Sequence, residues 1–491
     1  MSDIHTNKSQ KTNTPNSKQN DGASKSQTAL DEEAVLQFWQ DEQIFEKSLS
    51  RREGMKEFVF YDGPPFATGL PHYGHLLPGT VKDVIPRYYT MKGYHVERKW
   101  GWDCHGLPVE NIVEKDLNLN SRKDIIDYGI AKFNDAAREQ VLSYKDAWEQ
   151  IIPRSGRWVD MQDHYKTMDP LYTESTWWAF KELDKKGLVY KGYKPMHLCP
   201  RCETTLSNNE VAEGYEDITD ISVTAKFELA DEPGTYLLAW TTTPWTLPGN
   251  TAIAVGSEVT YAKVAVEKEG TTEYYILAQS RVEEVMQQAG VEEWEEVSVM
   301  GSEALVGKRY IPPYQYYYQD QSLEHHANGW QVYEASFVTD ESGTGIAHEA
   351  PAFGADDYYL ALEHQIPLVH HVTTSGRFTD EVTDFAGMLV KSKDDHQSAD
   401  IAIIKDLAHR GLLFSKEKIV HSYPHCWRCD TPLLNYATSS WFIASTELRA
   451  TMLAENAATH WVPDHIGHKR FHNWIENNVD WAVSRSRFWG A

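Results

Sequence analysis

The hydrophobic positions near the start of the chain separate a polar tail from a predicted helix. Four large apolar residues after Asp31 recur at helical spacing, so we expect a helix that Asp31 caps and that ends near Ser48. Before it, residues 1–29 are rich in Ser, Asn, Lys, Gln and Thr and contain almost no large apolar side chain. Such a segment cannot offset the entropy cost of ordering its backbone, which predicts a disordered tail.

The next apolar positions predict a strand, a turn, a helix and a second strand. The run 58–61 predicts a short buried strand, which the Gly and Pro residues at 63–65 end. A helix is expected to follow His75 and to end by Gly93, and residues 94–99 predict the second strand. This order is that of a βαβ unit. It predicts a parallel sheet with a ligand site at the carboxyl ends of its strands.

The middle of the chain changes from helical to strand periodicity. Residues 120–190 are expected to be mostly helical, with the clearest helix at 173–186 and Gly187 just beyond its end. From Ile218 to Leu229 apolar and polar residues alternate, which is typical of a half-buried strand. Further strands are predicted at 236–240, 252–255, 261–266 and 274–277. The region from about 213 to 400 is therefore expected to be a β-rich insertion.

Composition and charge narrow the class of protein. A length of 491 residues predicts about three domains. The chain has no run of about 18 apolar residues, which argues against a membrane span, and its first 29 residues lack the features of a secretory or mitochondrial signal. A cytoplasmic protein is expected. The formal net charge of -25 argues against a nucleic-acid partner, so composition alone does not predict an RNA ligand.

Two histidines three residues apart, His72 and His75, stand at the predicted start of the first long helix, with Gly74 between them. A helix N-terminus offers unpaired N–H groups and a partial positive charge to an anion, and two imidazoles add donors at the same place. Gly74 leaves room for a ligand to approach the backbone. Taken alone, however, such a pair is more often two surface histidines.

Four of the five cysteines form two C-x2-C pairs, Cys199 with Cys202 and Cys426 with Cys429. In a chain without an export signal, such pairs indicate a metal or redox site rather than structural disulfides. Four thiolates suit zinc and leave no position for water, which makes the role structural. The pairs can meet only if the segment between them leaves and returns at one place. A redox pair or free thiols are the alternatives.

Two segments of the β-rich region concentrate polar side chains. The first, at 240–250, carries Thr241, Thr242, Thr243, Thr246 and Asn250. The second, at 343–358, places His348 and the pair Asp356-Asp357 on a Gly-rich loop. Without further information, threonines in such a region are mostly strand formers and a pair of aspartates is mostly a helix cap.

Two blocks resemble the class I aminoacyl-tRNA synthetases. Residues 63–75 (GPPFATGLPHYGH) look like the HIGH-type signature of that family with its upstream loop. Residues 101–110 (GWDCHGLPVE) are similar to the isoleucyl version of the family's next block. The resemblance extends from about Leu30 to the end of the chain, and two matching blocks at the right separation make it specific.

The resemblance implies roles in amino-acid activation. His72, Gly74 and His75 would hold the phosphates of ATP, accompanied by Mg²⁺, and stabilise charge on phosphorus as the isoleucine carboxylate attacks. Asp103 would accept the ammonium group of isoleucine. The amino-acid site would also contain Gly63, Pro64, Trp481 and Trp489. The neighbouring Cys104 would serve packing only.

The same resemblance implies an editing site and a zinc site. Asp357 would anchor the ammonium of a mischarged residue, and His348 would limit the pocket to side chains smaller than isoleucine. Thr241, Thr242, Thr243, Thr246 and Asn250 would contact the terminal adenosine and order the attacking water. Cys199, Cys202, Cys426 and Cys429 would hold zinc at the base of the inserted domain.

The predicted fold class is α/β, an incomplete Rossmann-type class I catalytic domain with an inserted β-rich editing domain and a zinc knuckle at its base. The expected segments are a tail at 1–29, the first half of the catalytic domain with helical additions at 30–195, a first knuckle strand at 196–212, the editing domain at 213–400, a return segment with the second knuckle at 401–440, and the start of the second catalytic half at 441–491.

The activity that the resemblance implies is ATP-dependent activation of L-isoleucine, its transfer to tRNA(Ile), and hydrolytic editing of Val-tRNA(Ile), by a monomer. The family's lysine-rich KMSKS loop does not occur in these 491 residues, so the chain is expected to be a fragment without full ligase activity. The alternatives are an editing esterase only, a parent enzyme specific for valine, and a nucleotide- or RNA-binding protein without enzymatic activity.

Overall fold

The structure is a computed structural model that describes residues 25–268 and 270–490. The chain divides into two compact units. The first contains the residues up to Cys104 together with Val141–Asp169, and the second contains His105–Gln140 and Pro170–Ala491. Residues 1–24 of the tail expected at 1–29 lie outside the described residues. The expected end of the tail at residue 29 is wrong, because a helix already begins at Gln27.

The first unit opens with two helices where one was predicted. Helix α1 spans Gln27–Asp41 and is capped by Ser26, whose hydroxyl accepts a hydrogen bond from the Ala29 N–H at 3.2 Å. Asp31, the predicted cap, therefore lies inside the helix. Gln43 adopts a left-handed conformation with φ 48°, which ends the helical path before α2 begins at Ile44–Ser50.

The βαβ unit is present, but its first strand is reduced to single bridges. Glu57 pairs with His95 and Phe66 pairs with Asp103, both in parallel. Between these bridges the two prolines at 64–65 have no N–H to donate, and Val59 and Tyr61 are 64% and 91% exposed. The strand predicted at 58–61 is therefore wrong as a regular strand, and the parallel direction is confirmed.

The remaining elements of the first unit are two strands and two helices. Strands β1 (Lys99–Trp102) and β2 (Asp160–Lys166) pair in parallel, and the helices are α3 (Tyr73–Met91) and α7 (Lys145–Arg154). The second predicted strand is thus displaced from 94–99 to 99–102. Strand β2 was missed, because its sequence DMQDHYK shows no apolar run.

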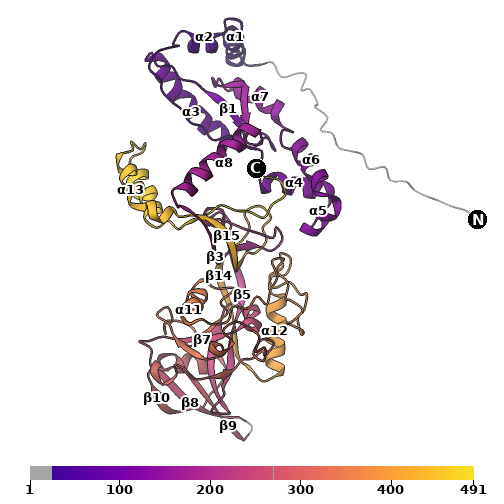
Figure 1. Cartoon of the computed structure of the whole chain (residues 1–491), viewed down its shortest axis with the longest axis vertical. Coiled ribbons are helices and arrows are strands. Elements are labelled where there is room, and N and C mark those ends of the chain that lie inside the picture. The colour runs from indigo at the N-terminus through magenta and orange to yellow at the C-terminus, as the bar shows by residue number, and fades with distance from the viewer. Residues whose placement is uncertain (1–24, 269, 491) are drawn as a thin grey trace, which may run out of the picture. The chain divides into compact units, whose positions relative to one another are not determined.

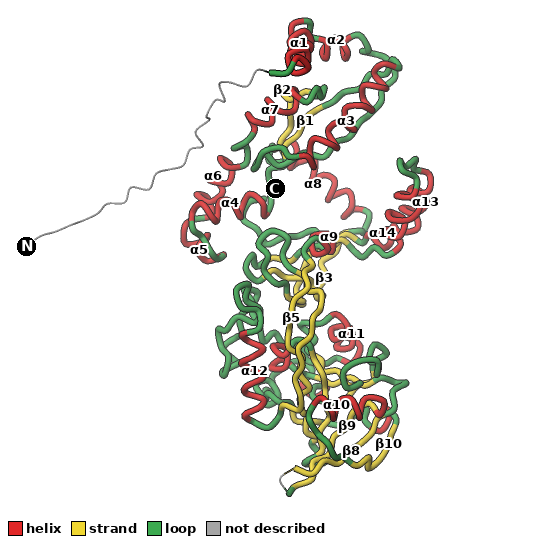
Figure 2. The backbone as a smooth tube through the Cα atoms, turned by 180° about the vertical axis from the view of Figure 1, so that it is seen from behind, coloured by secondary structure: helices red, strands yellow, loops and turns green. Residues whose placement is uncertain are grey.

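The second unit combines helices with two sheets (Figure 1 and Figure 2). Its helices are α4 (Leu107–Leu117), α5 (Arg122–Tyr128), α6 (Ile130–Gln140), α8 (Pro170–Lys185), α9 (Asn208–Ala212), α10 (Val282–Gln288), α11 (Ala355–His364), α12 (Ser398–His409), α13 (Arg449–Ala458) and α14 (His472–Glu476), with a π-helix at Ile466–Phe471. The helix predicted at 173–186 is confirmed as α8, with Gly187 beyond its end at φ 72°.

Two sheets organise the second unit. The four-stranded sheet has the order β16-β15-β3-β4, with bounds β3 Val189–Cys199, β4 Thr204–Thr205, β15 Leu434–Ile443 and β16 Trp481–Ala482. The ten-stranded sheet contains β5 (Tyr215–Leu229), β6 (Thr235–Thr241), β7 (Ala252–Val255), β8 (Tyr261–Lys268), β9 (Thr271–Ala278), β10 (Glu295–Met300), β11 (Tyr310–Ile311), β12 (Val332–Glu334), β13 (Ile346–Glu349) and β14 (Leu413–Pro424). The strands predicted between 236 and 277 are confirmed as β6 to β9.

Strand β5 is the spine of the larger sheet, since it pairs with β6, β11 and β14. In both views α11 and α12 lie on opposite sides of it (Figure 1 and Figure 2). Its polar positions Ser222, Thr224 and Lys226 are buried as well as its apolar ones. The prediction of a half-buried strand is therefore wrong, because both faces of β5 are covered, which alternation in a single strand cannot reveal.

Strand β14 pairs with β5 along its whole length, from Leu413 opposite Ala225 to Pro424 opposite Tyr215. The ten-stranded sheet thus extends beyond residue 400, where the insertion was expected to end. Two long antiparallel strands carry the chain into this sheet and back out of it. The second C-x2-C pair follows β14 directly, at the end of the return strand.

Candidate active site

His72 and His75 cap the N-terminus of α3. His72 is the N-cap residue, and its Nδ1 accepts a hydrogen bond from the Gly74 N–H at 3.0 Å. In return, the His72 N–H donates to Nδ1 of His75 at 3.2 Å. Because both Nδ1 atoms accept, both neutral rings carry their proton on Nε2. The pair therefore offers two N–H donors to a ligand at a helix N-terminus.

Gly74 has a different role from the one expected. A Cβ atom at this position would lie 2.7 Å from Cε1 of His72. The glycine therefore makes room for the capping imidazole ring, rather than directly for a ligand.

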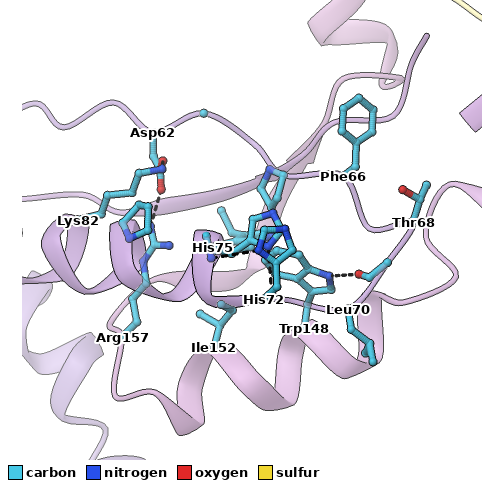
Figure 3. Close-up of a pocket in the computed structure, with 16 residues that line it drawn as sticks. Asp62, Phe66, Thr68, Leu70, His72, His75, Lys82, Trp148, Ile152 and Arg157 are labelled. Carbon is cyan, nitrogen blue, oxygen red and sulfur yellow. Dashed lines mark hydrogen bonds and ion pairs between the residues drawn. The ribbon is translucent and has the colours of Figure 1, made fainter. Parts of the chain in front are cut away.

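The histidine pair opens on a cavity of about 450 Å³ (Figure 3). Its wall combines the loop at 62–70, the first three turns of α3, and side chains from β1, α7 and the loop after α7. The lining residues are Asp62, Gly63, Pro65, Phe66, Thr68, Gly69, Leu70, His72, Gly74, His75, Pro78, Lys82, Trp100, Trp148, Ile152 and Arg157. The expected residue Gly63 is among them. Pro64 is not part of this lining in the described structure.

His75 is the more enclosed of the two histidines. Its ring packs edge-on against Trp148 with centroids 4.9 Å apart, and the Trp148 indole N–H donates to the Gly69 carbonyl at 2.8 Å. Burial lowers the pKa of His75, and electrostatic interactions with His72 and Lys82 lower it further. A neutral imidazole at neutral pH acts as a hydrogen-bond donor, which agrees with a positioning role rather than proton transfer.

Asp103 lies at the end of β1, next to the loop that forms the cavity. Its backbone N–H donates to the Pro65 carbonyl at 2.9 Å. This bond joins the two blocks of the sequence signature, residues 63–75 and 101–110, at the carboxyl edge of the parallel strands. Cys104 is fully buried, and burial raises the pKa of its thiol, which agrees with packing rather than nucleophilic attack.

Five of the seven predicted editing residues, Thr241, Thr243, Thr246, Asn250 and His348, form one hydrogen-bonded cluster in the second unit. Thr241 and Thr243 hydroxyls lie 3.3 Å apart, and Thr243 and Thr246 hydroxyls also lie 3.3 Å apart. Nε2 of His348 is 2.8 Å from the Thr246 hydroxyl. Thr242 lies half-buried between its two neighbours. Segments about a hundred residues apart thus meet, because β13 carries His348 between β6 and β7.

The hydrogen bonds fix the tautomer of His348. The Thr246 hydroxyl donates its proton to the Thr243 carbonyl at 2.7 Å, so it accepts from His348 Nε2–H. The amide of Asn250 lies 3.4 Å from His348 Nδ1, which is then the acceptor. Burial lowers the pKa of His348 to about 4, so the ring is neutral at physiological pH.

Tyr310 was missed by sequence reasoning. Its fully buried hydroxyl donates to Oδ1 of Asn250 at 2.7 Å and so orients the amide that faces His348. Tyr310 is sixty residues from Asn250 along the chain, and no local pattern links them.

Asp357 stands in the first turn of α11, where its Oδ2 accepts a hydrogen bond from the Ala350 N–H at 2.8 Å. Burial raises its pKa. Glu349, also missed, is buried beside it, and burial followed by the charges of Asp357 and Asp356 raises the pKa of Glu349 well above its usual range. A cationic ligand would relieve this crowding of carboxylates.

The four paired cysteines meet at one point. Their sulfur atoms all lie within 4.8 Å of one another, with Cys199 and Cys429 at 3.5 Å and Cys202 and Cys429 at 3.8 Å. Four sulfurs at zinc–sulfur bond lengths of about 2.3 Å in a tetrahedron would be about 3.8 Å apart. The thiol set and its spacing therefore fit a zinc ion. β3 and the end of β14 bring the two pairs together.

Comparison with known proteins decides the family. The family described as tRNA synthetases class I (I, L, M and V) matches residues 34–491. The chain belongs to this class I synthetase family.

Three relatives of this chain are isoleucine–tRNA ligases by name. Isoleucine–tRNA ligase of Treponema denticola is 46% identical over 94% of this chain and 44% of its own length. The Bdellovibrio bacteriovorus ligase is 47% identical over 94% of this chain and 42% of its own length. A Dictyostelium discoideum relative, 43% identical over 94% of this chain and 43% of its own length, is named as a cytoplasmic form. The chain thus spans less than half the length of these relatives.

A solved ternary complex of Agrobacterium radiobacter K84 agnB2 LeuRS with tRNA covers 82% of this chain at 17% identity, with a TM-score of 0.30. In the described part of the chain, no helix is both long and apolar enough to cross a membrane.

Trp489 of this class I chain is held by Glu110, the last residue of the second signature block. The fully buried Glu110 carboxylate accepts from the N–H groups of Phe488 and Trp489 at 3.0 and 2.6 Å and pairs with Arg487. Arg487 also donates to the Cys202 carbonyl at 2.6 Å. The second unit thus ties α4, the segment 487–489 and the cysteine knuckle together. Trp481 lies in β16, next to β15.

Proposed function

We propose that this chain is part of an isoleucine–tRNA ligase, in which it supplies one part of the amino-acid activation site and edits Val-tRNA(Ile). The observation that carries the proposal is the His72/His75 pair, which directs two N–H donors at a cavity from the N-terminus of α3, in a chain 46% identical to isoleucine ligases. The substrates are L-isoleucine, ATP with Mg²⁺, and tRNA(Ile). The protein acts as a cytoplasmic monomer.

In activation, a carboxylate oxygen of isoleucine forms a bond to the α-phosphorus of ATP, and the bond from that phosphorus to the leaving pyrophosphate breaks. His72 and His75 donate hydrogen bonds to phosphate oxygens, where negative charge develops. The dipole of α3 adds to this stabilisation. Asp103 binds the ammonium group of isoleucine, and Gly63 and Pro64 of the same unit shape the site for its side chain.

Editing follows from the limits of such a pocket. One methylene is worth about 1–3 kcal/mol of discrimination, a range for which isoleucyl enzymes themselves are the standard example, so valine is also activated. Asp357 binds the ammonium of the mischarged valine. Thr241, Thr242, Thr243 and Thr246 orient the terminal adenosine and the attacking water, and His348, held by Asn250, excludes the larger isoleucine.

Zinc is the metal that the cysteine cluster would hold, through Cys199, Cys202, Cys426 and Cys429. When bound with four thiolates, zinc supplies cross-linking and takes no part in the chemistry. The knuckle would thereby fix the two strands that lead into and out of the editing sheet.

Replacing His75 with alanine is expected to lower isoleucine-dependent exchange of pyrophosphate into ATP by about 10²- to 10³-fold, the usual cost of one such donor. The measurement uses a longer product of the same reading frame that contains a KMSKS-type loop, because the 491-residue chain alone is expected to show little or no exchange. His164→Gln, a change in the same unit but outside the cavity, is the control. Undiminished exchange by the His75 variant would contradict the role of this histidine, and absence of isoleucine dependence would contradict the ligase proposal.

Asp357→Asn is expected to slow deacylation of Val-tRNA(Ile) by about 10- to 100-fold, because the charge that binds the valine ammonium is lost. The asparagine oxygen can still accept the hydrogen bond of the Ala350 N–H, so the loop keeps its anchor. The exposed neighbour supplies the matched control Asp356→Asn. If both variants deacylate at the rate of the unchanged chain, Asp357 does not bind the substrate.

An editing esterase without ligase activity is the second candidate. The observation that favours it is the continuous hydrogen-bonded cluster from Thr241 to Asn250, which lies within the second unit alone. Deacylation without any isoleucine-dependent exchange would support this candidate.

A further inference from the structure

Beside the histidine pair, the cavity contains three charged side chains that the proposed function has not used (Figure 3). Lys82 lies two turns after His75 on the same face of α3, because seven residues make two helical turns. Arg157 comes from the loop that follows α7. Both pair with the single carboxylate of Asp62, Lys82 at Oδ1 and Arg157 at Oδ2.

Arg157 is held in place independently of Asp62. Its side chain is only 9% exposed, and its guanidinium lies over the ring of Trp100 at 5.2 Å from the centroid. It also lies over Gly79 of α3, where an added Cβ would be 3.7 Å from Nη1. A buried guanidinium fixed on two sides is preorganised for an anion, since its planar fork matches the oxygens of a carboxylate or a phosphate.

The charges of the three groups do not balance. Two cations face one carboxylate, which leaves a net charge of +1 on this wall of the cavity. The neighbouring His75 does not offset this positive charge, because an imidazole ring carries no negative charge. A structural ion pair needs one cation for one carboxylate, whereas a site for a polyanion needs the excess that is found here.

We propose that Lys82 and Arg157 form the subsite for the pyrophosphate part of ATP, and that Asp62 occupies it as an internal competitor when no nucleotide is bound. Phosphate oxygens replace Asp62 as partners of the two cations. When the bond between the α-phosphorus and pyrophosphate breaks, the added negative charge of the leaving group falls beside Lys82 and Arg157. Return of Asp62 to the two cations then favours release of pyrophosphate.

The inference rests on the proposed function for the identity of the anion as part of ATP. Its test uses inorganic pyrophosphate alone, without isoleucine or tRNA, and so can fail while the ligase proposal stands. A purely structural ion cluster predicts that loss of any member destabilises the fold and changes anion affinity in no particular direction. If Asp62 is a competitor, its neutralisation strengthens anion binding, whereas loss of either cation weakens anion binding.

The experiment titrates inorganic pyrophosphate into the 491-residue chain and its variants by isothermal calorimetry. Arg157→Gln and Lys82→Gln are expected to weaken binding by about tenfold or more each, as for the loss of a charge-assisted contact. Asp62→Asn is expected to strengthen binding several-fold, because the competitor is neutralised. Lys99→Gln is the control, since it removes an equal charge from an exposed ion pair of β1 with Asp163, outside the cavity.

Circular dichroism establishes that each variant is folded, and the half-exposed Lys82 supplies a variant with little effect on packing if Arg157→Gln does not fold. Adenosine, titrated in parallel, is expected to bind all variants equally. The proposal is overturned if Asp62→Asn weakens pyrophosphate binding as much as the cation variants do, if Lys99→Gln weakens it equally, or if the unchanged chain binds no pyrophosphate at millimolar concentration.

Discussion

Cys202→Ser is expected to remove the bound zinc and to cause a large loss of stability in the second unit. Structural zinc contributes an apparent free energy of about 10–16 kcal/mol in zinc-finger peptides, which is an upper guide for a knuckle inside a larger unit. The four sulfurs lie within 4.8 Å of one another, so one ion per chain is expected. Metal analysis of the purified chain and its thermal unfolding measure the two effects.

Cys104→Ala is the control for zinc loss. This cysteine is also buried but lies in the first unit and is not one of the four clustered cysteines. The variant is expected to retain the metal. Zinc retained by Cys202→Ser, or lost equally in Cys104→Ala, would show that the cluster is not the zinc site. Loss of the metal is also expected to loosen the segment 487–489, because Arg487 donates to the Cys202 carbonyl.

Lys391→Met is expected to lower the free energy of unfolding of the second unit by about 3–5 kcal/mol. The ammonium group is fully buried and lies 2.8 Å from Asp220 and 3.0 Å from Asp400, whose carboxylates are fully buried too. Removing the lysine leaves the buried Asp400 carboxylate without its cation and leaves Asp220 with the imidazoles of His421 and His396 beside it. Urea unfolding followed by tryptophan fluorescence measures the loss. Lys393→Met, two residues on, removes an exposed ion pair with Asp430 and is expected to cost less than about 1 kcal/mol.

The defect of Lys391→Met is expected to depend on pH. Burial raises the pKa of Asp400 to about 6 even with Lys391 beside it. A carboxyl group whose pKa is raised in the folded state binds more protons there than in the unfolded state, so its contribution to stability increases as pH falls through 6 towards 4. The variant should therefore lose less stability at pH 5 than at pH 8. An equal loss at both values would contradict an uncompensated buried carboxylate as the cause.

Asp400 links this ion cluster to the editing site. Its Oδ1 accepts a hydrogen bond from the Trp245 N–H at 3.1 Å, next to Thr246. The same substitution is therefore expected to slow deacylation of Val-tRNA(Ile) in protein that is still folded.

Local features were predictable from the sequence, because their causes are local. The βαβ order, a helix start close to the histidine pair and the strands β6 to β9 follow from Gly and Pro chemistry and period-two patterns within a few residues. The helix begins at Tyr73 rather than after His75 as predicted, because His72 caps it. The ends of helices were predicted less accurately from the sequence than their presence. Ser26 rather than Asp31 caps α1, since either side chain can accept the same kind of hydrogen bond.

Only the tertiary structure decided which distant residues meet. Strand β5 has an alternating pattern, but its second face is buried because neighbouring segments cover it. Trp245 and Asp400 are 155 residues apart, and Lys82 and Arg157 come from different elements around Asp62. The sequence by itself determined the family and the residue types of each site. The fold decided their partners, because burial, charge balance and tautomers depend on groups that no short stretch of sequence contains.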